Sequence, residues 1–298
     1  MKFRRLYNTK KIGFIGVGVM GKSMVRNLMK EGFEVSIYTR TKSKVLDIIE
    51  EGAKWCDDIK TCVQNKDFTI TIVGYPKDVE EVYFGENGIL ANAKEGACTI
   101  DMTTTSPKLS VKIYDEAKKR NIEALDAPVS GGDTGAKNAT LAIMVGGDLE
   151  TFDKCHDVLA SMGNNIIYEG KAGSGQHTKM ANQIAIAGAI SGVCEAMTYA
   201  NGAGLNVQKM LDSISTGAAG SWQMSNMAPR MLKGDFDPGF FIKHFIKDMK
   251  LALEESEESS LNLEVLKKVL DMYNILDENN LGDLGTQTLI KYYEEYSK

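Results

Sequence analysis

The chain has 298 residues, enough for one large domain or two ordinary ones, and its 43% hydrophobic and 25% charged residues are typical of a globular protein. A net charge of −5 argues against general affinity for nucleic acid, which requires dense neutralisation of phosphates. Five scattered cysteines without zinc-like pairing favour structural thiols in a reducing compartment, and the three histidines show no spacing typical of a metal site.

Two segments bear on location. The start, Met1 to Lys11, is basic, but no apolar stretch that could act as a secretory signal follows it. The most apolar stretch, Ile184 to Cys194, is too short to span a membrane. We therefore expect a cytoplasmic protein that binds neither membranes nor nucleic acid.

Up to about Tyr168, short runs of β-branched residues alternate with helical patterns. The expected strands are Lys11–Ile15, Glu34–Tyr38, Phe68–Val73, Ala97–Asp101, Ile122–Asp126, Leu141–Val145 and Asn165–Tyr168. Helical patterns between them include Gly18–Lys30, Thr41–Glu50 and Lys108–Lys119. This alternation predicts a largely parallel sheet covered by helices on both faces.

Beyond Gly170 the pattern becomes helical throughout. The first segment, about Gln176–Gly202, is long and rich in Ala and Gly, and further helices are expected at Val207–Thr216, Ser221–Leu232, Lys243–Ser259, Glu264–Glu278 and Gln287–Tyr296. A turn is expected at Gly234–Gly239. The fold class is therefore α/β: an N-terminal doubly wound Rossmann domain (9–171) and an all-α domain (172–298), joined by a long interdomain helix.

A glycine fingerprint follows the first expected strand. Gly16 suits the tight turn, Gly18 lets a pyrophosphate approach the backbone, and Gly21 allows close packing of the helix. The helix start offers free N–H groups and a positive dipole end to the phosphates. We expect a bound dinucleotide, with further contacts from Val19, Met20, Val73, Gly74 and Tyr75.

The end of the second strand bears on the choice between NAD and NADP. An NAD site usually carries an acidic residue there, whereas this chain has Arg40 followed by Lys44, with hydroxyls at Thr39 and Thr41. A guanidinium binds a 2′-phosphate through a bidentate fork. NADP is therefore favoured over NAD, although solvated basic residues would show the same pattern.

Two later motifs suit a small acid substrate. Ser130, Gly131 and Gly132 follow an expected strand and could form a nest for a carboxylate, although such turns often serve only as turns. Lys179, Asn182 and Gln183 project from one face of the long helix, an arrangement suited to a polarised carbonyl. An ordinary solvated lysine would fit the same spacing.

Together these motifs resemble the β-hydroxyacid dehydrogenase family, which includes 3-hydroxyisobutyrate dehydrogenase and the tartronate, glyoxylate and succinic semialdehyde reductases. The resemblance runs from about Lys11 to Tyr296 and rests on four segments in the expected order: Gly13–Gly21, Asp126–Gly147, Gly173–Gln183 and Lys247–Met249. The pair Asn182-Gln183 departs from the Asn-Asn that is common in the family, and it is also found among the semialdehyde reductases.

The resemblance implies roles for individual residues. Lys179 would be the catalytic lysine, and Ser130, Gly131 and Gly132 would hold the substrate carboxylate. Either Asn182 or Gln183 would contact the substrate. Thr104 would meet the nicotinamide end and Lys247 would reach the cofactor, while Phe240, Asp248 and Trp222 would line the substrate pocket; a plain core tryptophan is an equal alternative at Trp222.

The expected activity is NADPH-dependent reduction of a short aldehyde acid to the hydroxy acid, with Lys179 donating the proton. A lysine with an ordinary pKa is protonated at neutral pH, whereas the reverse reaction would need a depressed pKa. One alternative is an NAD(P)-dependent oxidation of a 3-hydroxy acid of the 3-hydroxyisobutyrate type, and another is a noncatalytic dinucleotide-binding sensor. Relatives imply a homodimer or homotetramer.

Overall fold

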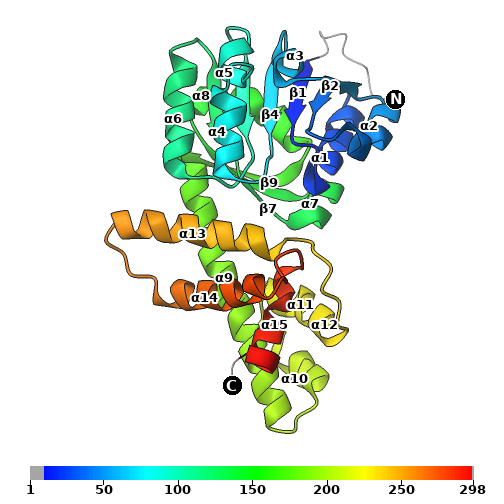
Figure 1. Ribbon diagram of the computed structural model, residues 1–298, viewed down its shortest axis with the longest axis vertical. Coiled ribbons are helices and arrows are strands. Elements are labelled where there is room, and N and C mark those ends of the chain that lie inside the picture. The colour runs from blue at the N-terminus through cyan, green and yellow to red at the C-terminus, as the bar shows by residue number, and fades with distance from the viewer. Residues whose placement is uncertain (1–9, 297–298) are drawn as a thin grey trace. The chain divides into compact units, whose positions relative to one another are not determined.

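The computed structural model describes residues 10–296 (Figure 1). Most of the basic start and the expected first residue of the cofactor domain lie outside this range. The chain forms two compact units whose boundary falls between Lys179 and Met180. None of the helices in the described range combines the length and the apolar character that a membrane span requires.

The first unit is built on a nine-stranded sheet. Its strands are β1 (Lys11–Ile15), β2 (Glu34–Tyr38), β3 (Lys54–Trp55), β4 (Phe68–Thr71), β5 (Cys98–Asp101), β6 (Glu123–Asp126), β7 (Val129–Ser130), β8 (Leu141–Gly146) and β9 (Gly163–Gly170). The order is β3-β2-β1-β4-β5-β6-β8-β7, with β9 paired to β8. The first six form a parallel sheet in the Rossmann order.

The expected parallel core is confirmed, with two additions. β3 and β7 have two residues each, too few to show an alternating pattern in the sequence. β8 runs antiparallel to β6 and β7, so the sheet is mixed at this end. Antiparallel pairing brings Ser130 beside Ala142.

Helices cover both faces of this sheet (Figure 1). They are α1 (Val19–Lys30), η1 (Lys42–Val45), α2 (Leu46–Glu50), α3 (Ile59–Val63), α4 (Pro76–Phe84), α5 (Ile89–Asn92), α6 (Pro107–Lys118), α7 (Gly132–Asn138) and α8 (Leu149–Ala160). Successive strand residues point to opposite sides, so Phe14 joins the core under α1, α2 and α8 while Ile15 joins the core under α3 to α6. The helix expected over Thr41–Glu50 is instead a 3-10 turn followed by α2.

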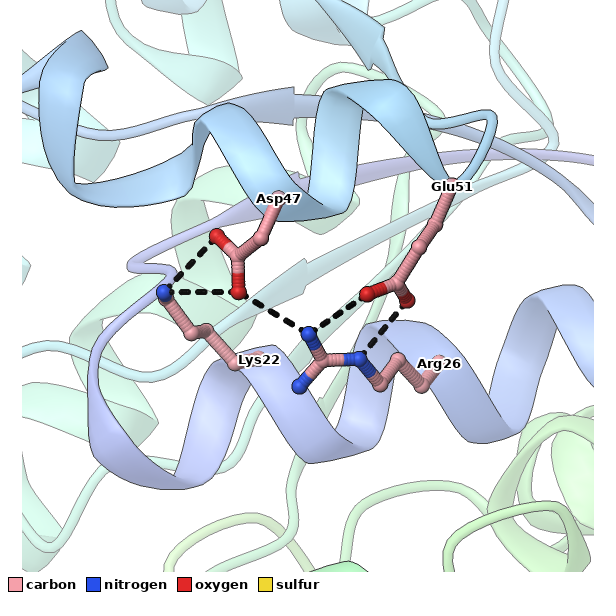
Figure 2. A network of polar contacts seen from close by, with 4 residues as sticks. All are labelled: Lys22, Arg26, Asp47 and Glu51. Carbon is pink, nitrogen blue, oxygen red and sulfur yellow. Dashed lines mark hydrogen bonds and ion pairs between the residues drawn. The ribbon is translucent and has the colours of Figure 1, made fainter.

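A polar network joins α1 to α2 (Figure 2). Lys22 donates to both Asp47 oxygens at 2.8 and 3.0 Å, and Arg26 bridges Asp47 at 2.9 Å and both Glu51 oxygens at 2.7 Å. Bonds with Lys22 and Arg26 hold the pKa of Asp47 below its usual range. The network ties the helix that follows the glycine turn to the one that follows β2.

The second unit is helical. The long helix α9 (Ser174–Gly202) runs from the first unit into the second, followed by α10 (Val207–Ile214), α11 (Trp222–Asn226), α12 (Ala228–Leu232), α13 (Ile242–Glu258), α14 (Glu264–Glu278), η2 (Thr286–Thr288), α15 (Leu289–Lys291) and η3 (Tyr292–Tyr296). Their apolar faces form one core around residues such as Phe245 and Tyr273. Within its described part this unit has no strand, only an isolated bridge between Phe241 and Gly285.

Two of the expected helices are interrupted. The segment Ser221–Leu232 divides at Met227 into α11 and α12, because Pro229 in the first turn of α12 has no N–H to continue the ladder. The last segment, expected as one helix over Gln287–Tyr296, passes through 3-10, α and π geometry.

Candidate active site

The three glycines of the fingerprint differ in whether the surrounding protein leaves space for a side chain. Gly16 has φ +98°, and a Cβ there would collide with the carbonyl of Ile72, while a Cβ on Gly21 would collide with the carbonyl of Gly16. Gly18 has an ordinary φ of −87°, and a Cβ there would meet no described atom within 4 Å. Packing within the described residues therefore does not require glycine at position 18, and the open space there is compatible with close approach of a ligand.

The start of α1 suits a pyrophosphate. Gly18 is its N-cap, and no side chain caps it and no acidic residue occupies its first turn. Val19 is 58% exposed and Met20 is half-buried. The N–H groups and the positive dipole end therefore face open space at the carboxyl end of β1.

The turn after β4 borders the same edge of the sheet, where the strand order reverses between β1 and β4. The Val73 N–H donates to Thr103 Oγ1 at 3.0 Å, and the Tyr75 N–H donates to Asp78 at 3.0 Å. Val73 and Gly74 are half-buried and Tyr75 is 40% exposed. The expected cofactor residues from β1 and β4 thus lie at the position where doubly wound sheets bind ligands.

Arg40 extends from the end of β2 with 81% of its side chain exposed, and contacts Asp78 at 3.4 Å. Thr41 and Lys44 are also exposed, and the Lys44 N–H donates to the Thr41 carbonyl in the 3-10 turn. No acidic residue occurs between Tyr38 and Val45. A weak surface ion pair leaves the guanidinium able to exchange Asp78 for a phosphate.

Ser130, Gly131 and Gly132 make a sharp turn between β7 and α7. Gly131 has φ +130° and Gly132 has φ +63°, conformations that favour glycine. Gly131 is exposed, and Ser130 and Gly132 are half-buried. Successive N–H groups in such a turn can face one anion.

Lys179 lies beside this turn. Its side chain is 6% exposed, and its Nζ donates to the carbonyl of Val129 at 2.8 Å. A buried ammonium is costly unless it is hydrogen-bonded, so the solvated lysine considered from the sequence is excluded. The structure therefore brings the Lys179 ammonium next to the residue that precedes Ser130.

Two buried aspartates at neighbouring strand ends organise these loops. Asp101 accepts from the Thr71 hydroxyl at 2.7 Å and the Thr103 N–H at 3.1 Å, while Asp126 accepts from the N–H groups of Gly173 at 2.7 Å and Gln176 at 2.9 Å. Burial raises the pKa of Asp101 to about 6 and raises the pKa of Asp126. Sequence reasoning gave neither a role, although both end expected strands.

The two amides after Lys179 are bonded differently in the helical unit. Gln183 is 1% exposed and its Nε2 donates to Asp248 at 2.6 Å, whereas Asn182 is half-buried and donates to Gln183 Oε1 at 2.7 Å. Lys247 Nζ lies 2.9 Å from the other Asp248 oxygen. Gln183 is thus held inside a polar chain, and Asn182 lies at its more accessible end.

Of the remaining expected residues, Phe240 and Trp222 lie elsewhere in the helical unit, and Thr104 lies in the first unit. Phe240 packs against Phe245 with ring centroids 5.9 Å apart. Trp222 is 61% exposed at the start of α11, so it is not a core tryptophan. Thr104 is half-buried in the loop between β5 and α6. In residues 10–296, no three His, Cys, Asp or Glu side chains gather as a metal site would require.

Comparison with known proteins agrees with this geometry. Residues 11–170 match the family described as the NAD-binding domain of 6-phosphogluconate dehydrogenase, and residues 173–293 match that described as NAD-binding of NADP-dependent 3-hydroxyisobutyrate dehydrogenase. An uncharacterized oxidoreductase of Bacillus subtilis is 55% identical over 95% of this chain and 99% of its own. The chain belongs to the β-hydroxyacid dehydrogenase family.

Other relatives in this family carry more specific names. A probable 3-hydroxyisobutyrate dehydrogenase-like protein of Arabidopsis thaliana is 44% identical, covering 94% of this chain and 84% of its own. The 2-hydroxy-3-oxopropionate reductase of Escherichia coli is 34% identical, covering 95% and 97%. The solved 3-hydroxyisobutyrate dehydrogenase of Mycobacterium tuberculosis is 28% identical, with a TM-score of 0.87 and coverage of 95% and 99%.

As a β-hydroxyacid dehydrogenase, the protein is an oxidoreductase that acts on CH–OH groups with a nicotinamide dinucleotide. The glycine turn, the open start of α1 and the strand-order reversal fit that cofactor. Sequence reasoning missed Gln176, whose side chain is fully buried. Its place three residues before Lys179, on the same helix face, was the available signal.

Proposed function

We propose that this β-hydroxyacid dehydrogenase reduces a short aldehyde acid, of the semialdehyde or glyoxylate type, to the hydroxy acid with NADPH. One observation carries the proposal: the buried Lys179 ammonium is bonded to Val129, immediately before the turn of Ser130, Gly131 and Gly132. Reduction of a short molecule that carries both a carboxylate and an aldehyde needs a site that binds the carboxylate and a proton donor close to it.

In the proposed reaction, the Ser130 hydroxyl and the N–H groups of Gly131 and Gly132 bind the substrate carboxylate. Lys179 turns its ammonium from the Val129 carbonyl toward the aldehyde oxygen and stabilises the negative charge that develops there. A nicotinamide bound at the glycine turn would supply the hydride that the aldehyde carbon accepts. Lys179 then gives its proton to the oxygen, which completes the alcohol, and regains a proton from solvent.

We assign the cofactor preference to Arg40, assisted by Thr39, Thr41 and Lys44. The support is a basic, exposed segment without a carboxylate where an NAD site usually has one. Asp78 offsets part of this charge, and the 2′-phosphate would displace it from Arg40. Thr104 is assigned to the nicotinamide end, and Lys247 also to the cofactor.

Of the two amides, we assign the substrate contact to Asn182. Gln183 has both ends of its amide engaged, with Asp248 and Asn182, so it orients Asn182 instead of binding the substrate itself. Phe240, Trp222 and Asp248 remain proposed to line the substrate pocket. We also propose that residues 9–171 and 172–298 are the functional domains of a cytoplasmic homodimer or homotetramer.

The second candidate is NAD(P)-dependent oxidation of a 3-hydroxyisobutyrate-type acid. It is favoured by the name of the Arabidopsis relative and by the description of the family matched by residues 173–293. The same Lys179 would then act as a base. Initial rates decide between the two directions and cofactors.

The experiment is a rate panel with purified enzyme. NADPH and NADH are each tested with glyoxylate, succinic semialdehyde and tartronate semialdehyde, and NADP and NAD with 3-hydroxyisobutyrate and L-serine. We expect the highest kcat/KM with NADPH and an aldehyde acid. Lys179→Ala should lower kcat at least about 100-fold while NADPH binding stays within about threefold.

The exposed lysine Lys209, in α10, gives the control variant Lys209→Ala, which should match the parent. Faster oxidation of 3-hydroxyisobutyrate than reduction of every aldehyde acid would select the second candidate. Substantial turnover by Lys179→Ala would remove the lysine from the reaction. An enzyme that bound NADPH and turned over no acid would contradict both candidates.

A further inference from the structure

Gln176 is a polar side chain with no exposed surface. It lies in the first turn of α9, three residues before Lys179. A buried amide is costly unless its donor and its acceptor are both satisfied. Its hydrogen-bond partners therefore show what the residue does.

Both partners belong to the loop between β5 and α6. Gln176 Oε1 accepts from the Thr105 N–H at 3.0 Å, and Nε2 donates to the Thr103 carbonyl at 2.8 Å. The two bonds lie on either side of Thr104, so the amide brackets this residue as a neighbouring strand would. Glutamate lacks the donor and methionine lacks both groups, so neither can replace the pair.

The backbone of Gln176 is fixed as well. Asp126 accepts from the N–H groups of Gly173 and Gln176, which anchors the first turn of α9 at the end of β6. A Cβ on Gly175 would collide with the carbonyl of Met144, so this turn packs directly on the strand ends. The Gln176 side chain therefore extends from a rigid base.

Lys179 lies one turn further along the same helix and bonds to Val129 at 2.8 Å. One helical turn thus ties two separate segments: Gln176 holds the loop of Thr104, and Lys179 lies at the strand before Ser130. Because a helix is stiff over one turn, the spacing between Thr104 and the proton donor depends on the Gln176 amide.

We propose that Gln176 is a positioning residue for hydride transfer, which holds the Thr104 loop at a set distance from Lys179. The inference rests on the proposed function, in which Thr104 meets the nicotinamide end and Lys179 donates the proton. Misplacing the reacting groups by about 1 Å can cost about 100-fold in rate, so two hydrogen bonds suffice for a large effect.

The test uses Gln176→Met, which keeps the side-chain volume and removes both bonds. We expect faster amide hydrogen exchange in the peptide that contains Thr103 and Thr105, because the Thr105 N–H loses its acceptor. In a single turnover with NADPH and the best aldehyde acid, the rate of hydride transfer should fall about 10–100-fold. The amplitude, which counts competent enzyme, and the Kd for NADPH should change less than about threefold.

Gln287 supplies a matched control. It is 1% exposed and its Nε2 donates to the carbonyls of Asp235 and Asp237, both at 3.0 Å, within the helical unit. Gln287→Met should lower thermal stability without speeding exchange at Thr105 and without lowering the single-turnover rate.

Unchanged exchange at Thr105 in Gln176→Met would overturn the inference, because the loop would not depend on the amide. Faster exchange with an unchanged hydride-transfer rate would overturn it too, since Gln176 would then serve stability alone. If the parent itself reduces no acid, the proposed function fails, and the exchange measurement still decides whether Gln176 holds the loop.

Discussion

Arg40 is the residue to which we assign the choice of cofactor. Its guanidinium is 81% exposed and is bonded only weakly, to Asp78 at 3.4 Å. Such a surface ion pair contributes little to the free energy of unfolding, so stability does not require Arg40. Its removal should therefore affect binding and leave the fold intact.

We predict that Arg40→Asp raises the KM for NADPH about 10–100-fold and leaves the KM for NADH unchanged or lower. The guanidinium bonds to the 2′-phosphate would be lost, and the new carboxylate would repel the phosphate while accepting bonds from a ribose. The measurement is initial rates with both cofactors at a saturating aldehyde acid.

The control is Lys119→Asp, which makes the same change of charge between α6 and β6, at the amino end of the parallel strands, whereas Arg40 follows the carboxyl end of β2. An equal rise in the KM for NADPH in the two variants would show that the change in net charge alone causes the effect. An unchanged KM for NADPH in Arg40→Asp would contradict the phosphate-binding role.

The glycine turn contains glycines that folding requires and one glycine to which we assign cofactor binding. Gly16 and Gly21 lie where a side chain would collide with the protein's own backbone. Gly18 lies where a Cβ would meet nothing, at the end of the helix dipole. Packing therefore requires glycine at positions 16 and 21, and under the proposed function the cofactor requires it at position 18.

This difference predicts separable effects of two single methyl groups. The free energy of unfolding of Gly18→Ala should stay within about 0.5 kcal/mol of that of the parent. Its affinity for NADPH should fall at least about 10-fold, because the methyl group occupies the space assigned to the pyrophosphate. Gly21→Ala should lose stability by about 1–3 kcal/mol through overpacking. Urea unfolding without cofactor and NADPH fluorescence titration measure the two quantities.

If Gly18→Ala were as destabilised as Gly21→Ala, the open space at position 18 would be filled in the folded protein. Full NADPH affinity in Gly18→Ala would contradict the assigned pyrophosphate path.

The free energy of unfolding of the whole molecule should depend on pH, because the buried Asp101 carboxylate destabilises the folded protein when it is ionised. Burial raises the pKa of Asp101 from 3.8 to about 6. Between these values the folded protein retains a proton that the unfolded chain releases, so stability falls as the pH rises through this interval. Above about pH 6 Asp101 is ionised in the folded protein, and the whole loss of stability from its burial is present.

Asp101→Asn removes the charge and keeps an oxygen that can accept from Thr71 and Thr103. We predict that at pH 7 its free energy of unfolding exceeds that of the parent by about 1–3 kcal/mol. The difference should shrink as the pH falls from 6 and vanish near pH 4. Urea unfolding at several pH values measures it.

Asp153→Asn, which neutralises an exposed carboxylate in α8, serves as the control and should match the parent throughout. A difference for Asp101→Asn that does not vary with pH would show that the side-chain shape matters and its ionisation does not.

The long helix α9 marks the limit of prediction at the scale of elements. Its existence and nearly all of its length follow from local helical periodicity, as do the first strands and the glycine turn. Short elements such as β3 and β7 have too few residues to show a pattern. The single helix predicted over Ser221–Leu232 took no account of Pro229, and the chain divides there into two helices.

What the sequence by itself determined is the chain order of the longer strands and helices and the glycine turn after the first strand, since these depend on spacing between near neighbours. The catalytic role of Lys179 is a prediction that rests on the family resemblance. Only the tertiary structure decided which side chains hold these elements in place. Gln176 meets residues 71 and 73 positions away, and Asp126 meets Gly173 across 47 positions. It also decided that Gln183 is engaged with Asp248. Contacts of this kind arise from the folding of distant segments together, so no local periodicity records them.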